Sequence, residues 1–170
     1  MAFGNEVIAV VEAGKLPAGL MEFRLDHVAF QVRNVDEAAK RFRARGAEYC
    51  KTFTPDGPLV ISEFWESGIR YVFFNGPGGW PFEFCRKLGL DHDIGSEGHG
   101  HYSIRVSDIN AVEARLKELG AKSIASYRLG EQDVVDVRFM QVGDDTFEIL
   151  NEAPFPDPPE SHGWIGLLPR

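Results

Sequence analysis

The sequence predicts an α+β fold made of two repeated βαβββ modules. Three observations predict it. One constant shift along the chain aligns His27–Val32 with His101–Val106 and Gly46 with Gly120, so a single register covers a strand, a helix and its end. Each copy changes from alternating to helical hydrophobic spacing and then runs into three short β-branched and aromatic stretches. With 170 residues, 44% of them hydrophobic, the chain can bury a core.

The first module begins with Leu25–Val32, where apolar and polar residues alternate as in a half-buried strand. A helix is expected over Asp36–Arg45, with Gly46 placed to end it. Ser-Gly and Gly-Pro-Gly-Gly turns then separate three further predicted strands, at Leu59–Phe64, Ile69–Asn75 and Trp80–Cys85.

The second module repeats this order, and the predicted domain organisation follows from it. We expect a strand at 101–106, a helix at 109–119 and strands near 123–128, 134–141 and 146–150. Near the end of each copy a smaller shift matches Phe82–Phe84 with Phe147–Ile149, because one loop is shorter in the second copy. The predicted parts are an N-terminal extension (1–23), the first module (24–86), a connector (87–97), the second module (98–150) and a Pro-rich C-terminal arm (151–170).

Composition excludes several classes of function. A net charge of −8 without a Lys/Arg-rich run argues against binding to nucleic acid or to anionic membranes. The two cysteines, Cys50 and Cys85, form no CxxC motif, so neither a disulfide scaffold nor a zinc ribbon is indicated. The chain shows no secretory signal and no apolar run near the roughly 18 residues of a membrane span. We therefore expect a cytoplasmic protein with a small-molecule substrate.

Four residues with metal-binding side chains occupy equivalent positions in the two copies: His27 and His101, and Glu83 and Glu148. Strand alternation places apolar core residues on either side of both glutamates, and a buried carboxylate needs a partner. A single histidine or glutamate of this kind is usually an ordinary strand residue, but four in register favour a ligand set. Two imidazoles and two carboxylates suit one divalent ion per site, such as zinc, nickel, cobalt, manganese or iron.

These motifs resemble the vicinal-oxygen-chelate superfamily, which includes glyoxalase I, methylmalonyl-CoA epimerase, extradiol dioxygenases and bleomycin-resistance proteins. The resemblance covers roughly residues 24–150 and is carried by Leu25–Val32, Asn75–Glu83 and the segment from His99 to Gly120. It implies a curled mixed sheet around a metal cavity, with the four residues named above as metal ligands.

The resemblance also implies a reaction. The implied reaction resembles the reactions of glyoxalase-type isomerases, epimerases and lyases, in which a metal-bound enediolate forms while a glutamate moves a proton. Glu148 is the first choice for this catalytic role and Glu83 the second. Extradiol dioxygenases generally use two histidines and one glutamate, so Glu83 disfavours that alternative. A ligand-sequestering protein of the bleomycin-resistance type is the third possibility.

Three further residues are expected to bind a small oxygenated, anionic substrate. Arg105 and Ser103 share a strand face with His101, and Gln31 is the first-module equivalent of Arg105. A salt bridge at the rim is the alternative role for Arg105. Cys85 shares the face of Glu83, where a small buried thiol is the simpler interpretation.

Apolar aromatic residues leave two readings open, because they either line a cavity for a flat ligand or form the sheet core. They are Phe53, Phe64, Trp65, Phe73, Phe74 and Trp80. Modules of about 60 residues bury little apolar surface on their own, so we also expect a homodimer.

Overall fold

The computed structural model describes residues 2–3, 6–7, 21–76, 81–89, 98–130, 135–151 and 163–167. The chain divides into two compact units. Unit 1 comprises Met1–Asp26, Tyr102–Phe155 and His162–Arg170, and unit 2 comprises His27–His101 and Pro156–Ser161. Two strands, β3 (Met21–Gln31) and β7 (Gly98–Val106), each begin in one unit and end in the other.

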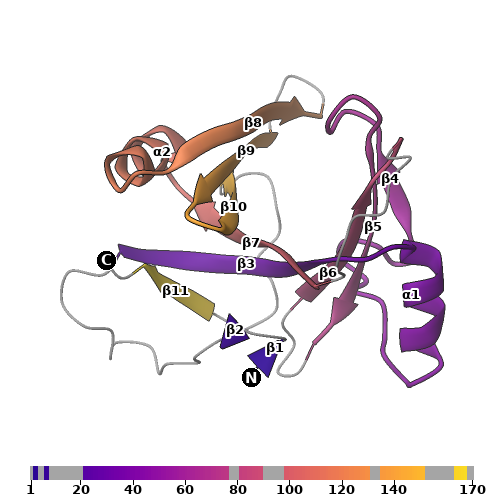
Figure 1. Ribbon diagram of the computed structural model, residues 1–170. Helices are drawn as coiled ribbons and strands as arrows, with labels where there is room; N and C mark the ends of the chain where they lie inside the picture. The colour runs from indigo at the N-terminus through magenta and orange to yellow at the C-terminus, as the bar shows by residue number, and fades with distance from the viewer. Residues whose placement is uncertain are drawn as a thin grey trace. The chain divides into compact units, whose positions relative to one another are not determined.

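Unit 2 contains the first βαβββ module (Figure 1). The end of β3 is followed by α1 (Val35–Arg43), β4 (Leu59–Ile61), β5 (Ile69–Asn75) and β6 (Pro81–Lys87). β6 pairs in parallel with β3 and antiparallel with β5, which in turn pairs antiparallel with β4. The predicted strand at Leu59–Phe64 is shorter than expected, because the chain turns after Ile61.

Unit 1 contains the second module in the same order. After β7 come α2 (Ile109–Glu118), β8 (Lys122–Leu129), β9 (Val135–Val142) and β10 (Asp145–Asn151). β10 pairs in parallel with β7 and antiparallel with β9, and β8 pairs antiparallel with β9. Both modules have the order strand, helix and three strands, with the first and last strands parallel, and this confirms the predicted α+β repeat.

Two further pairings involve the ends of the chain. β1 (Ala2–Phe3) pairs with β2 (Glu6–Val7). The tail expected to be a Pro-rich arm includes a strand, β11 (Gly163–Leu167), which pairs antiparallel with Met21–Leu25 of β3. The strand β11 was not predicted from the sequence. It contains no proline, so every backbone N–H there can take part in a ladder.

Both helices begin with the same capping device. The side chain of Asn34 accepts a hydrogen bond of 3.0 Å from the Glu37 backbone N–H, and Asp108 accepts one of 2.9 Å from the Ala111 N–H. The two caps occupy equivalent positions of the repeat, and each satisfies one of the N–H groups that a helix start leaves without a partner.

Both helices also end alike. The Gly46 N–H donates to the Arg43 carbonyl oxygen and the next residue, Ala47, donates to Phe42, which is the hydrogen-bond pattern of a Schellman motif. Gly46 has a φ of +89°, the left-handed conformation that glycine adopts without a Cβ penalty. Gly120 ends α2 with the equivalent bonds.

We expect Asn34→Ala to lower the free energy of unfolding by about 1 kcal/mol, the usual contribution of a helix N-cap. Asn34→Asp keeps an accepting oxygen and should be close to wild type. Urea denaturation of the three proteins measures the difference. Equal loss in both variants would show that the side chain acts by packing and not as a cap.

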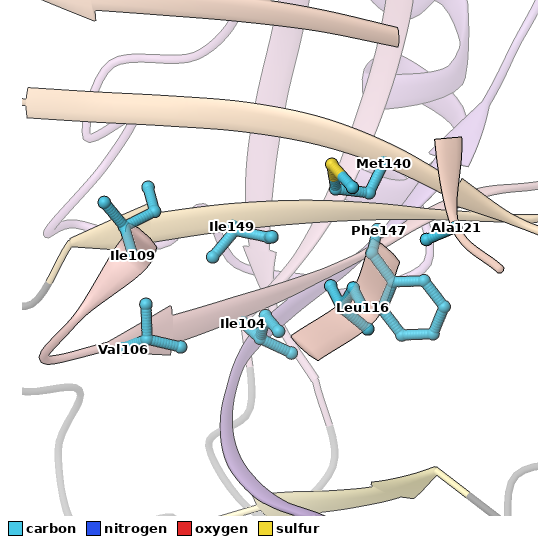
Figure 2. Close-up of a cluster of buried hydrophobic side chains, with 8 residues drawn as sticks. All are labelled: Ile104, Val106, Ile109, Leu116, Ala121, Met140, Phe147 and Ile149. Atoms are coloured by element: carbon cyan, nitrogen blue, oxygen red, sulfur yellow. The ribbon is translucent and has the colours of Figure 1, made fainter. Parts of the chain in front are cut away.

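Each module buries an apolar cluster between its sheet and its helix. Figure 2 shows the cluster of unit 1, to which β7, α2, β9 and β10 contribute. Its buried members are Ile104, Val106, Ile109, Leu116, Ala121, Met140, Phe147 and Ile149. The cluster of unit 2 comprises Val32, Val35, Ala38, Ala39, Val72, Phe74 and Phe84. Because strand side chains alternate, residues on the opposite face of each sheet carry the polar groups described below.

Among the described residues, no helix is long and apolar enough to span a membrane.

Candidate metal centre

His27, Glu83 and His101 converge within unit 2. The Nε2 atoms of both histidines lie 3.5 Å from the same carboxylate oxygen, Oε2 of Glu83. The two imidazole rings lie 5.5 Å apart, centroid to centroid. His27 and Glu83 are each only 4% exposed, and the His101 side chain is 13% exposed. Three groups predicted to bind one ion are thus gathered around one buried carboxylate oxygen.

Strand register explains the convergence. Parallel pairing places Ala29 of β3 opposite Glu83 of β6, so His27, two residues before Ala29, projects from the same face of the sheet. Gly100, just before His101, lies against the β3 backbone: a Cβ there would be 3.3 Å from both the Ala29 carbonyl oxygen and the Gln31 amide nitrogen. The absence of a side chain at Gly100 therefore lets the start of β7 approach β3 closely and brings His101 to the site.

The geometry suits a divalent ion. A separation of 3.5 Å exceeds the 2.7–3.2 Å of a good N–H···O hydrogen bond. Neighbouring ligand atoms around a tetrahedral ion with bonds of about 2.0–2.1 Å are separated by about 3.3 Å. Two imidazoles and one carboxylate are also donors that zinc and its neighbours in the periodic table prefer. These residues could hold such an ion.

Cys85 belongs to the same group of potential ligands. One ligand atom each from Glu83, Cys85 and His101 can be chosen so that all three lie within 4.8 Å of one another. Cys85 follows Glu83 by two residues on β6 and is half-buried. A small buried thiol was the simpler interpretation of the sequence, and the structure places Cys85 near Glu83 and His101.

Tyr71 was missed by the sequence analysis. The β5–β6 register places Tyr71 opposite Cys85 and Phe73 opposite Glu83, so both aromatic rings lie on the face that carries the carboxylate. Burial raises the pKa of the Tyr71 phenol, and the charge of Glu83 raises it further. Alternation along Ile69–Asn75 gives Tyr71 the same face as Phe73, which is the signal that could have found it.

The aromatic residues divide between core and site. Phe74 is fully buried in the apolar cluster of unit 2, as the core interpretation predicts. Phe73 points the other way and packs edge-on against His27, with ring centroids 4.8 Å apart, and against Phe53 at 4.7 Å. The Trp65 ring lies 4.1 Å from the ammonium nitrogen of Lys87. Phe64 is buried and packs against Trp65, whereas Trp80 lies outside the described residues.

Glu148 belongs to unit 1, where it lies on β10 and is 6% exposed. The parallel register pairs Glu148 with Ser103 and Leu150 with Arg105, so Glu148 shares a sheet face with Ser103 and Arg105. Its burial between the core residues Phe147 and Ile149 also agrees with the sequence. The role of Glu148 as a metal ligand and base stays a prediction from the repeat.

Arg105 has an internal partner. Its guanidinium donates to the carboxylate of Asp26, and the two residues are 3% and 4% exposed, so they form a buried ion pair and not the rim salt bridge considered from the sequence. Asp26 was not singled out by the sequence analysis. Strand alternation places Asp26 on the same face as Val28 and Phe30. A carboxylate among apolar residues needs a cationic partner, so this pattern could have predicted a buried ion pair at Asp26. Gln31, half-exposed on β3, lies opposite Cys85 in the register.

Comparison with known proteins identifies the fold. No family model matches the chain, and no curated protein matches its sequence. Methylmalonyl-CoA epimerase from Mycobacterium tuberculosis superposes with a TM-score of 0.62 at 21% identity, covering 84% of this chain and 97% of that one. A methylmalonyl-CoA epimerase in complex with methylmalonyl-CoA and NH4+ gives 0.58 at 19% identity, covering 81% and 100%. A Streptomyces coelicolor epimerase variant bound to 2-nitronate-propionyl-CoA gives the same values.

At these identities the likeness concerns the fold. It spans most of this chain and nearly all of each neighbour. The chain therefore has the fold of these methylmalonyl-CoA epimerase structures.

Proposed function

We propose that the protein is a divalent-metal-dependent epimerase or isomerase of glyoxalase type. It would move a proton on the carbon next to a carbonyl group of a small, oxygenated, anionic substrate such as an acyl thioester. The observation that carries the proposal is the convergence of two histidine Nε2 atoms on one buried carboxylate oxygen of Glu83. The complexes of the structural neighbours with methylmalonyl-CoA and 2-nitronate-propionyl-CoA support the choice of substrate class.

The proposed ligand set is His27, Glu83, His101 and Glu148. The first three rest on the geometry of unit 2, and Glu148 rests on its position equivalent to Glu83 in the repeat and on its burial. A bound divalent ion would stabilise the negative charge that develops on the substrate oxygen as the C–H bond breaks.

The protein supplies the base. Glu148 is the first candidate to take the proton from the substrate carbon and return it, with Glu83 the second. Both glutamates are buried, and a low-dielectric environment strengthens the attraction between a carboxylate and a bound metal cation. The edge-on ring of Phe73 holds the His27 imidazole in place from the side of β5.

Metal binding and proton exchange together test the proposal. We expect the purified protein to bind one divalent ion per chain and to melt at a higher temperature with the ion than after chelation, because the ion binds the folded state. Glu83→Ala should abolish most of this shift. Glu118→Gln, which changes an exposed carboxylate at the end of α2, is the matched control.

The reaction itself is followed by NMR in D₂O. Deuterium should enter methylmalonyl-CoA, or an adduct of a 2-oxoaldehyde with a thiol, at the carbon next to the carbonyl. Oxygen consumption with a catechol and Fe(II) or Mn(II) would instead identify a ring-cleaving dioxygenase. Tight binding of a flat ligand with no turnover would identify a sequestering protein, and either result would replace the proposed reaction.

A further inference from the structure

We propose that the sulfur of Cys85 is a ligand of the metal ion, so that the centre is a mixed imidazole, carboxylate and thiolate site. This inference rests on the metal centre of the proposed function. It departs from a centre of two histidines and two glutamates by adding a soft, negatively charged donor.

Geometry is the first argument. Glu83 and Cys85 project from the same face of β6, and one ligand atom from each of Glu83, Cys85 and His101 lies within 4.8 Å of the other two. Atoms bound to one zinc ion at about 2.0–2.3 Å would be separated by about 3.3–3.6 Å. Separations of at most 4.8 Å are close to these values, and rotation of the cysteine side chain can bring the sulfur nearer to the other two atoms.

The hydrogen bond that Cys85 makes to Phe30 does not oppose that movement. The Cys85 Sγ donates to the Phe30 carbonyl oxygen at 3.8 Å, a long and weak hydrogen bond even for sulfur. Binding to the ion would release the thiol proton to water and form a metal–sulfur bond, as cysteine ligation requires. A weak hydrogen bond is thereby exchanged for a strong bond to the metal.

The consequence is metal preference. Imidazole and carboxylate donors accept manganese and magnesium as well as zinc, whereas a thiolate favours softer ions. With Cys85 bound, the centre should favour zinc, cobalt and cadmium over manganese and magnesium. This selectivity would not follow from the two histidines and two glutamates alone.

Cys50 provides a matched control. It is buried, at 7% exposed, and it does not belong to the group of Glu83, Cys85 and His101. Cys50→Ser therefore removes a buried thiol without touching the centre, and Cys85→Ser removes the thiol beside Glu83. Both variants keep a side chain of similar size.

Cobalt(II) spectroscopy of the full chain gives the test. The wild-type protein and Cys50→Ser should show the intense near-ultraviolet band of sulfur-to-cobalt charge transfer, and Cys85→Ser should lose it while keeping the weaker visible bands of bound cobalt. Competition between ions should show Cys85→Ser losing about 10-fold or more in zinc affinity, the lower end of what altering a metal environment costs, with a smaller change for manganese.

Two results would overturn the inference. Visible cobalt bands without charge transfer in the wild-type protein would mean that the ion binds without Cys85, and the proposed function would then stand. A charge-transfer band that survives in Cys85→Ser would assign the sulfur elsewhere. Failure to bind cobalt, zinc or manganese at all would instead remove the metal centre and the proposed function together.

Discussion

Glu148→Gln is expected to lower turnover by about 100-fold or more, the range for losing a general base. Glutamine keeps the size of the side chain and one oxygen that can bind a metal, but it cannot accept a proton from carbon at neutral pH. Metal content, measured by elemental analysis, should fall only modestly. Rates of deuterium incorporation into the substrate give the turnover.

Glu83→Gln separates the roles of the two carboxylates. Because Oε2 of Glu83 lies 3.5 Å from both histidines, its replacement should weaken metal binding more than the change at Glu148 does. Normal turnover in both variants, with Glu118→Gln as the exposed control, would show that neither glutamate is the base. The proposed chemistry would then be wrong even with the metal centre intact.

Asp26→Asn is expected to lower the free energy of unfolding by about 3–5 kcal/mol. The change leaves the guanidinium of Arg105 buried without the opposite charge that now contacts it, and uncompensated burial of a charge is strongly destabilising. Urea denaturation at neutral pH measures the loss, with the slope of the transition checked for two-state behaviour.

The double replacement Asp26→Leu with Arg105→Met is the control for this prediction. It removes both charges together and should recover most of the lost stability, since apolar side chains of similar size often replace a buried ion pair without cost. If the double variant is as unstable as Asp26→Asn, the residues act through shape and not through charge. Substrate binding in a folded double variant would also test the predicted role of Arg105.

Local patterns were sufficient to predict most of the secondary structure. Ile69–Asn75 was predicted as a strand and is β5, and the predicted helix stops at Gly46 and Gly120 are both confirmed. These features depend on neighbouring residues: alternation defines a strand face, and glycine in a left-handed conformation ends a helix. The repeat supported these predictions, because each local pattern occurs once in each module.

The site was predictable only as far as strand faces determine it. Alternation placed Glu83 and Cys85 on one face and could have placed Tyr71 with Phe73. Only the β5–β6 register shows that these two aromatic residues lie opposite Cys85 and Glu83. Asp26 and Arg105 are far apart in the sequence. The sequence alone therefore does not predict that their side chains form an ion pair. β11 was not predicted because the prolines of the tail suggested an arm, although most of them precede β11 and none lies within it.

The composition of the two units also sets an order of assembly during synthesis. Most of unit 2 is one continuous segment, His27–His101, which contains the residues that pair the four strands of that module. Unit 1 joins Met1–Asp26 to Tyr102–Phe155 and His162–Arg170, and Met21–Leu25 of β3 pairs with β11 near the end of the sequence. Pairing of residues so distant in sequence closes a long loop, which costs more chain entropy than closing a short loop and slows folding. During synthesis, residues 21–25 of β3 can therefore pair with β11 only after residues 163–167 have been made, when the segment His27–His101 is already complete.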